Sequence, residues 1–355
     1  MTTTETIKWT EDRVRRLVRP NILTVKPYSS ARSEFKGKAE VLLDANESPF
    51  DNGMNRYPEP LSTEIRVLLA NLRGVHPDKI YIGNGSDEIV DQLTRVFGVP
   101  GKDAVHALPP TFGMYKVAAG INDIAFRDTN LTPDFTIPVD ELKDSWDEKS
   151  KILWLCSPNN PSGNLMDAEV VEDLIRTFPG VVVLDEAYID FALEESFLPR
   201  LDEFPNLVIT QTLSKGWGMA GARLGAAYAS EFIINLLRTI KMPYNINVLT
   251  KAAAIEALTA PEQMQQRVDL LVSERKRLEK ALGELDIVDR IFPSVTNFLL
   301  VRFTDSDKVY RYLLEKGIVV RNQSYQPNAE NCLRITAGLP AENDALIAAL
   351  RGFER

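Results

Sequence analysis

Short apolar runs recur along much of the chain, and segments with a different pattern separate them. Seven runs rich in valine, isoleucine and alanine predict buried strands, at 79–82, 104–108, 124–127, 152–156, 181–184, 207–210 and 225–229. Between several of them, apolar residues recur every three or four positions, which predicts helices over 87–97, 113–119 and 168–178. Strands and helices that alternate in this way are typical of a mostly parallel α/β sheet covered on both faces.

The pattern changes after Ser230. Long amphipathic segments predict helices over 232–239, 248–258, 261–282, 307–316 and from 341 onward. Between them, short apolar runs predict strands at 298–303, 318–321 and 333–336. This α+β part has the size of a second, smaller domain.

The N-terminal part of the chain is less regular. Thr10 is placed to cap a short basic helix over 11–18, and an extended, proline-punctuated stretch follows it. A short strand is predicted at 41–43 and a helix at 61–72. We therefore expect an N-terminal arm, a large domain and a small domain, which divide the chain as 1–35, 56–244, and 36–55 with 245–355.

Composition and charge exclude several classes of protein. Apolar residues make up 44% of the chain, and the net charge of −9 argues against a general nucleic-acid binder. Cys156 and Cys332 lie in apolar runs, which indicates buried thiols. We see no secretory signal and no membrane-spanning run, and expect a cytoplasmic protein. His76 and His106 lack the motifs of a zinc site or a Ser-His-Asp triad, so we expect no metal.

One polar stretch follows the predicted strand 207–210. It contains Thr212, Ser214 and Lys215 in a glycine-rich turn, and Arg223 lies eight residues beyond the lysine. Desolvation would lower the pKa of a lysine at the end of a buried strand and make its amine nucleophilic. Two hydroxyls and a guanidinium suit a phosphate group. A nucleophilic lysine beside a phosphate site is what pyridoxal phosphate (PLP) requires for a Schiff base; the alternative is an ordinary surface lysine.

Four more polar or aromatic clusters follow predicted strands, where open α/β sheets bind their ligands. Ser86, within 83–88, is placed to cap a helix whose free N–H groups could hold a phosphate, although a plain capped helix has the same pattern. Phe112 could stack on a flat ring or could belong to the core. Asn160, in a proline-rich turn, could donate to a phenolate oxygen.

Asp185 ends a wholly apolar strand, and Tyr188 follows three residues later. A buried carboxylate needs a partner, and a protonated pyridine nitrogen would serve. Tyr188 could then reach the ring hydroxyl oxygen. A magnesium site at Asp185 is the competing hypothesis, but no second acidic cluster supports it.

The segment 216–221 has the spacing of the GxGxxG dinucleotide-binding motif. That motif opens a helix after the first strand of a βαβ unit. Here the glycines lie late in the strand series and lead directly into another predicted strand, 225–229. The context therefore argues against an NAD-binding site.

Taken together, these motifs resemble those of the fold-type I PLP-dependent aminotransferases, and more narrowly the histidinol-phosphate aminotransferase family. The resemblance covers nearly the whole chain, and the motifs that carry it are 56–58, 83–88, 109–115, 157–163, 185–188 and 212–215. It implies the fold of that class, with a mostly parallel seven-stranded sheet in the large domain.

The resemblance also implies roles for individual residues. Lys215 would carry the cofactor and shuttle the proton, with Asp185 on the ring nitrogen and Tyr188 on the ring oxygen. The implied cofactor-binding residues are Tyr57, Gly85, Ser86, Asp87, Phe112, Asn160, Asp185, Tyr188, Thr212, Ser214, Lys215 and Arg223. The implied substrate-binding residues are Tyr28, Asn46, Arg321 and Arg334. Phe112 departs from the tyrosine that many relatives carry, so a hydroxyl contact is lost there.

The family's activity implies the substrates and the assembly. Glutamate or 2-oxoglutarate would exchange an amino group with L-histidinol phosphate or its keto form, in histidine biosynthesis. Tyr57 matches a tyrosine that reaches the cofactor phosphate of the neighbouring subunit, which implies a homodimer with shared sites. Aromatic aminotransferases and threonine-phosphate decarboxylase are similar in outline and remain alternatives. A PLP-sensing transcription factor would need a DNA-binding domain, and the 40 residues before Val41 are too few for one.

Overall fold

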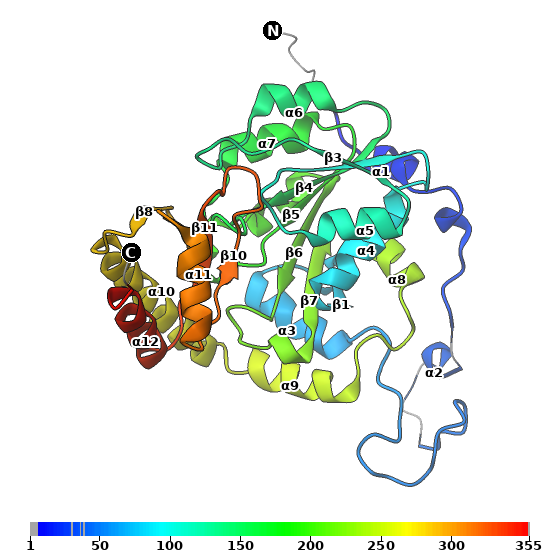
Figure 1. Ribbon diagram of the computed structural model, residues 1–355. Coiled ribbons are helices and arrows are strands. Elements are labelled where there is room, and N and C mark those ends of the chain that lie inside the picture. The colour runs from blue at the N-terminus through cyan, green and yellow to red at the C-terminus, as the bar shows by residue number, and fades with distance from the viewer. Residues whose placement is uncertain (1–5, 30, 36, 38–39, 354–355) are drawn as a thin grey trace.

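A seven-stranded sheet forms the centre of the computed structural model, which describes residues 6–29, 31–35, 37 and 40–353 (Figure 1). Across the sheet the strands are β1 (Ile80–Asn84), β7 (Leu224–Ala229), β6 (Leu207–Thr212), β5 (Val181–Asp185), β4 (Ser150–Cys156), β2 (Ala104–Ala107) and β3 (Ala125–Asp128). Only β7 runs antiparallel to its neighbours, β1 and β6. The prediction of a mostly parallel sheet is confirmed.

Helices cover both faces of this sheet, as the alternation of strands and helices predicts. One face packs against α3 (Thr63–Arg73), α7 (Ala168–Thr177) and α9 (Val248–Leu258). The other packs against α1 (Glu11–Leu17), α4 (Gly85–Phe97), α5 (Met114–Ile121) and α8 (Glu231–Ile240). The remaining helices of this part are the short α2 (Ala31–Glu34) and α6 (Val139–Ser145).

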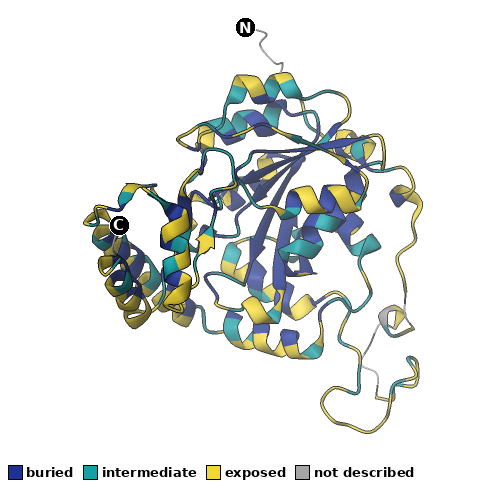
Figure 2. Ribbon diagram, in the orientation of Figure 1, coloured by how far each residue is buried: buried dark blue, intermediate teal, exposed yellow. Residues whose placement is uncertain are grey.

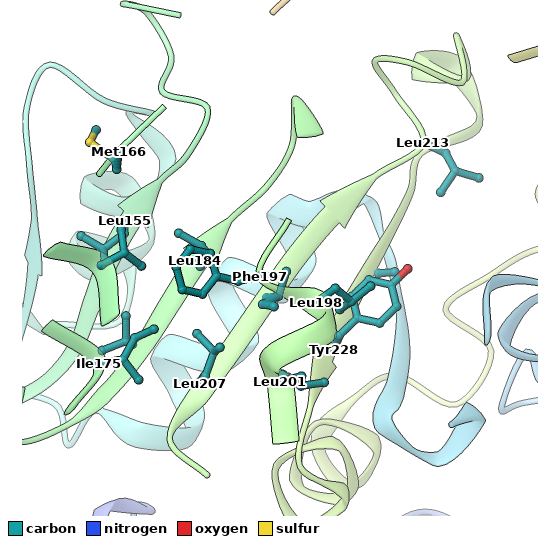
Figure 3. Packing of buried hydrophobic residues seen from close by; sticks show 14 of the residues in the cluster. Leu155, Met166, Ile175, Leu184, Phe197, Leu198, Leu201, Leu207, Leu213 and Tyr228 are labelled. Carbon is teal, nitrogen blue, oxygen red and sulfur yellow. The ribbon is translucent and has the colours of Figure 1, made fainter. Parts of the chain in front are cut away.

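The inner strands of the sheet are rich in apolar residues because both of their faces are buried. In β5, Val182 and Leu184 enter one hydrophobic cluster, whereas Val181 and Val183 enter the cluster on the opposite face. Figure 3 shows the first cluster, where side chains of neighbouring strands pack side by side against Ile175 of α7 and the segment at 197–201. In Figure 2 the sheet is accordingly almost wholly buried.

A second, four-stranded antiparallel sheet follows later in the chain. Its order is β10 (Arg321–Asn322), β11 (Cys332–Thr336), β9 (Phe298–Phe303) and β8 (Val288–Ile291). It packs with α10 (Pro261–Gly283), α11 (Ser306–Glu315) and α12 (Pro340–Arg351) around a hydrophobic cluster of its own. Figure 1 shows this unit beside the large sheet. The domain boundaries that we assigned from the sequence remain a prediction.

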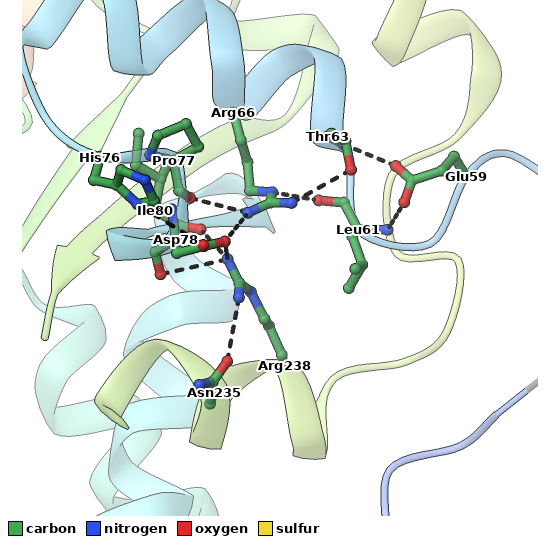
Figure 4. A network of polar contacts seen from close by, with 10 residues as sticks. All are labelled: Glu59, Leu61, Thr63, Arg66, His76, Pro77, Asp78, Ile80, Asn235 and Arg238. Atoms are coloured by element: carbon green, nitrogen blue, oxygen red, sulfur yellow. Dashed lines mark hydrogen bonds and ion pairs between the residues drawn. The ribbon is translucent and has the colours of Figure 1, made fainter. Parts of the chain in front are cut away.

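Two arginines fix the start of β1, the strand that leads into α4 (Figure 4). Arg66 of α3 is buried and donates to the carbonyl of Pro77 at 2.9 Å and to Asp78 at 3.3 Å. Arg238 of α8 donates to the carbonyl of Ile80 at 3.3 Å. Helices from opposite faces of the sheet are thereby tied to the start of the same strand.

Several predictions of local structure were wrong. Residues 41–43 do not form a strand, because Val41 and Leu43 are exposed and no second strand pairs with them in the described chain. The predicted strand at 318–321 is reduced to β10, and the pattern missed α6 and β8. At the N-terminus, Thr10 caps α1 as predicted, accepting the N–H of Arg13 at 3.3 Å.

Both cysteines and one of the two histidines are buried. Cys156 and Cys332 are buried free thiols, as predicted. His106 is buried, its ring nitrogen lies 2.8 Å from the Ser150 hydroxyl, and burial lowers its pKa to about 4. The imidazole of His106 is therefore neutral and structural. Of the helices in the described chain, none is both long and apolar enough to cross a membrane.

The hydrophobic core between the second sheet and its helices can be tested directly. Leu313 and Leu314 are neighbours on α11, but Leu313 is fully buried whereas Leu314 is 42% exposed. We expect Leu313→Ala to lower the free energy of unfolding by about 2–5 kcal/mol, because it leaves a cavity. Leu314→Ala is the matched control and should cost well under half as much in denaturant unfolding. Equal losses in the two variants would contradict the packing described here.

Candidate active site

A cavity of about 310 Å³ lies at the carboxyl ends of β4, β5 and β6. The register of the strands brings Cys156, Asp185 and Thr210 side by side across this edge. The residues that line the cavity are Ser86, Asp87, Phe112, Cys156, Asn160, Asp185, Ala187, Tyr188, Thr212, Ser214, Lys215, Ala220, Arg223 and Arg334. The polar strand ends that the sequence singled out therefore do meet in one place.

Asp185 forms the buried acidic end of the cavity, with only 3% of its surface exposed. The Tyr115 hydroxyl donates to its Oδ2 at 2.6 Å, and the Ala187 N–H donates to its Oδ1 at 3.0 Å. Burial raises the pKa of the Asp185 carboxyl, and these two donors oppose that shift by stabilising the charged form. Such a carboxylate is poised to accept a cationic partner.

Lys215 follows β6 and points its amine toward the same space. Its Nζ lies 5.5 Å from the centroid of the Tyr188 ring. Burial is the main cause that lowers the pKa of Lys215, and the positive charge of Arg334 adds to it, whereas Asp185 and Asp87 act in the opposite direction. A larger share of this amine is therefore neutral and nucleophilic near neutral pH than for an ordinary lysine.

An anion-binding corner lies at the start of α4. The N–H groups of a helix's first turn have no partner within the helix, so those of Ser86 and Asp87 can serve a ligand. Arg223 donates to Asp87 across this corner at 3.1 Å. Gly225 of β7 allows the close approach, since a Cβ there would lie 2.5 Å from the Ser86 nitrogen.

Our prediction that Ser86 caps this helix was wrong. The helix begins one residue earlier, at Gly85, with Asn84 in the cap position and no capping hydrogen bond from its side chain. Glu88 instead accepts the N–H of Asn84. The side chain of Ser86 consequently remains on the cavity wall, and Gly85, with φ +77°, makes the turn that only glycine adopts readily.

The two hydroxyls near Lys215 lie close together. Thr212 donates from its Oγ1 to the Ser214 hydroxyl at 3.0 Å, and the same oxygen accepts the Ser214 N–H at 3.2 Å. Both residues line the cavity. Ser214 is partly exposed and Thr212 is buried, so Ser214 is the better placed of the two to contact a ligand.

Arg334 brings a cation from the second sheet into this cavity. It lies on β11, and its Nη1 donates to the side-chain oxygen of Asn160. Its Nε is buried, and in the part of the chain that the structure describes no atom accepts a hydrogen bond from it. A buried guanidinium N–H without a partner fits a site that receives an anionic ligand.

Apart from Gly85, which directly precedes the lining residue Ser86, four residues that the sequence singled out lie outside the cavity lining. Tyr57 is 53% exposed and stacks on Tyr244 with ring centroids 4.5 Å apart, and Tyr28 is exposed on the N-terminal arm. Asn46 is exposed on the loop before Tyr57. Arg321 pairs with Arg334 across two strands but is itself exposed. The described chain alone does not bring these four side chains together with Lys215.

Sequence reasoning also missed contributors. Cys156, Ala187 and Ala220 line the cavity without any polar signal that could have marked them. Tyr115 lies within the motif 109–115 that the sequence singled out, but nothing in that motif indicated a contact with Asp185. Its hydroxyl is the donor to Asp185 described above.

The assembled groups fit pyridoxal phosphate better than a metal ion. An amine with a lowered pKa matches the aldehyde of this cofactor, and a buried carboxylate matches its basic ring nitrogen. The aromatic side chain matches its flat ring, and the anion-binding corner matches its phosphate. Within the described residues, no group of three or more His, Cys, Asp and Glu side chains could hold a metal. The glycine-rich segment at 216–221 leads into the antiparallel strand β7 and opens no dinucleotide-binding helix.

Comparisons with known proteins agree with this assignment. The family model described as aminotransferase class I and II matches residues 33–350. The chain is 48% identical to a histidinol-phosphate aminotransferase of Parabacteroides distasonis, over 95% of this chain and 98% of that protein. It is 49% identical to a protein of the same name from Christiangramia forsetii, over 96% of this chain and 98% of that protein.

Solved structures show the same fold. The histidinol-phosphate aminotransferase of Sinorhizobium meliloti in complex with pyridoxal-5'-phosphate superposes with a TM-score of 0.76 at 25% identity, covering 83% of this chain and 82% of that one. The L-threonine-O-3-phosphate decarboxylase of Porphyromonas gingivalis gives 0.71 at 27% identity, covering 84% and 90%.

The electrostatics of the cavity predict an unusual lysine. In the cofactor-free chain, competitive acetylation as a function of pH should give Lys215 a pKa below the ordinary 10.5, and Arg334→Gln should raise it, because one source of positive charge is removed. Arg302→Gln, on β9 of the same sheet, is the control and should leave the pKa of Lys215 unchanged. A Lys215 pKa that Arg334→Gln does not move would contradict the electrostatic coupling.

Proposed function

The chain belongs to the aminotransferase class I and II family, and we propose that it transfers an amino group between L-histidinol phosphate and 2-oxoglutarate, in histidine biosynthesis. The products are glutamate and 3-(imidazol-4-yl)-2-oxopropyl phosphate. The observation that carries this proposal is the 48–49% identity, over nearly the full length, to relatives named histidinol-phosphate aminotransferase. Both cysteines are free, which fits a cytoplasmic enzyme.

Pyridoxal phosphate is the cofactor that the cavity would hold. When bound, it supplies an electron sink that stabilises the negative charge left when a proton leaves the substrate carbon next to the amine. Asp185 would hold the protonated ring nitrogen, and Asn160 and Tyr188 would hold the ring oxygen. Phe112 would lie against the ring face. The phosphate would bind at the N-terminus of α4, with the backbone of Gly85, Ser86 and Asp87 and the side chains of Thr212, Ser214 and Arg223.

Lys215 has two tasks in this scheme. Its neutral Nζ anchors the cofactor aldehyde, which its lowered pKa favours. When it is not attached to the cofactor, the same Nζ would act as the base that moves the proton of the substrate α-carbon. Tyr188, whose pKa burial raises, stays protonated and can donate to the ring oxygen throughout.

Arg334 would bind the anionic group of each substrate in turn. L-histidinol phosphate presents a phosphate ester, whereas glutamate presents a carboxylate. A planar guanidinium donates to either oxyanion, and the buried Nε of Arg334 is one such donor. Arg321, its neighbour on β10, would add a second positive charge to the site. Tyr28 and Asn46 would lie near its entrance.

We also infer a homodimer with shared sites. Between Leu23 and Leu61 the described chain exposes many large apolar side chains, namely Leu23, Val25, Tyr28, Phe35, Val41, Leu43, Phe50, Met54, Tyr57 and Leu61. So much exposed apolar surface favours an interface, and a second copy of this chain is the simplest partner. Tyr57 would then reach the cofactor phosphate in the partner's cavity.

A decarboxylase acting on threonine phosphate is the second candidate, favoured by the structural match to that enzyme. Its substrate also joins an amino group to a phosphate ester. The two activities differ in their products, since decarboxylation releases carbon dioxide and needs no 2-oxoglutarate. Aromatic amino acids are further substrates that a screen should include.

The test of the function is a coupled assay with L-histidinol phosphate and 2-oxoglutarate. We expect glutamate to form, and Lys215→Ala to reduce its formation by at least about a hundredfold, because the proton-transferring amine is gone. Lys149→Ala, at an exposed lysine, is the control and should match the wild type. Release of carbon dioxide from threonine phosphate in place of glutamate formation would overturn the proposal.

Hybrid dimers test the shared site. Lys215→Ala and Tyr57→Ala should each be impaired alone. If Tyr57 serves the partner's cavity, a hybrid of the two variants contains one site with both residues intact, so mixing and reassociation should restore roughly a quarter of the wild-type activity. If Tyr57 served its own chain, every site would lack one of the two residues, and mixing would restore nothing.

A further inference from the structure

We propose that Tyr115 is a positioning residue for the cofactor: its hydroxyl holds the Asp185 carboxylate charged and turned toward the ring nitrogen. This inference rests on the role proposed above for Asp185. Tyr115 itself is not among the residues that line the cavity. It therefore acts through Asp185 and not by touching the cofactor.

The hydrogen bonds fix the carboxylate from two directions. The Tyr115 hydroxyl donates to Oδ2 from α5, at 2.6 Å, while the Ala187 N–H donates to Oδ1 from the turn after β5, at 3.0 Å. Each oxygen thus has a donor from a different element, so the plane of the carboxylate is set. Without the Tyr115 hydroxyl, rotation about the last side-chain bond of Asp185 would be restrained on one side only.

Packing holds the Tyr115 ring so that its hydroxyl stays at Asp185. The residue is fully buried, and its ring stacks on Trp154 with centroids 4.8 Å apart and planes 9° apart. The ring of Phe112 meets it edge-on at 5.6 Å. Because Phe112 carries no hydroxyl, Tyr115 is the residue of this aromatic pair that can donate to the carboxylate.

Charge explains why the contact matters for the cofactor. Asp185 is buried, and a buried carboxyl short of donors takes up a proton and becomes neutral. A neutral carboxyl attracts a protonated ring nitrogen far less than a carboxylate does. Tyr115 remains a donor, since burial and the neighbouring Asp185 raise its own pKa well above the usual value.

The experiment compares two ligands on the cofactor-free, full-length chain. One is pyridoxal phosphate and the other its carbocyclic analogue, in which a C–H group replaces the ring nitrogen. The measured quantity is the ratio of the two dissociation constants. We expect Tyr115→Phe to reduce the preference for pyridoxal phosphate by about tenfold or more, the usual worth of a hydrogen bond to a charged group, while binding of the analogue is nearly unchanged.

Two further variants distinguish a failure of the role of Tyr115 from a failure of the role of Asp185. Asp185→Asn should abolish the preference, because no carboxylate remains to meet the nitrogen. Tyr81→Phe removes a buried hydroxyl from β1 of the same sheet, away from the cavity, and should leave the preference intact. Phenylalanine at 115 keeps the ring that stacks on Trp154, and equal unfolding midpoints for Tyr115→Phe and Tyr81→Phe would verify an intact fold.

The outcomes are distinct. If Asp185→Asn abolishes the preference and Tyr115→Phe does not reduce it, the inference about Tyr115 is wrong, while the role of Asp185 stands. If Tyr115→Phe weakens the binding of both ligands equally, the tyrosine is merely structural and the inference is again overturned. If Asp185→Asn keeps the preference, the role proposed for Asp185 fails, and the inference that depends on it fails with it.

Discussion

A carboxylate buried at the end of the central strand is the constraint on which the rest of the site depends. Asp185 is costly there, because burial favours its neutral form, and the fold surrounds it with donors that oppose this. On either side of it, β4 ends at Cys156 and β6 ends at Thr212, and the turns that follow carry Asn160 and Lys215 to the same edge. Parallel pairing of β4, β5 and β6 therefore gathers an acid, an amide and an amine without any long-range loop.

The second sheet completes the site because it packs tightly against one turn of the first. Gly163 faces Ser294, where an added Cβ would lie 2.4 Å from the serine hydroxyl, and its carbonyl accepts the N–H of Val295 at 2.9 Å. The same proline-rich turn holds Asn160, to which Arg334 donates. A residue proposed to bind the ring and a residue proposed to bind the substrate anion are thus directly linked, so the position of one depends on the other.

The sequence was most informative where local pattern and burial agree. Runs such as 181–184 are apolar on both faces and could only be central strands, and the polar residues after them had to meet at one sheet edge. The strand expected at 41–43 failed because its apolar residues have no partner within the described chain. Tyr115 was missed because its importance comes from a hydrogen bond to a residue 70 positions away. Tyr57, Tyr28, Asn46 and Arg321 lie outside the cavity, and no pattern within one chain can say what a second chain would bring to them.

The most direct test of the account is to find where the cofactor attaches. The chain loaded with pyridoxal phosphate would be reduced with borohydride, digested, and mapped by mass spectrometry. The account predicts one pyridoxyl-labelled peptide, with the label on Lys215, the amine whose pKa the cavity lowers. A label on any other lysine, or none at all, would contradict it.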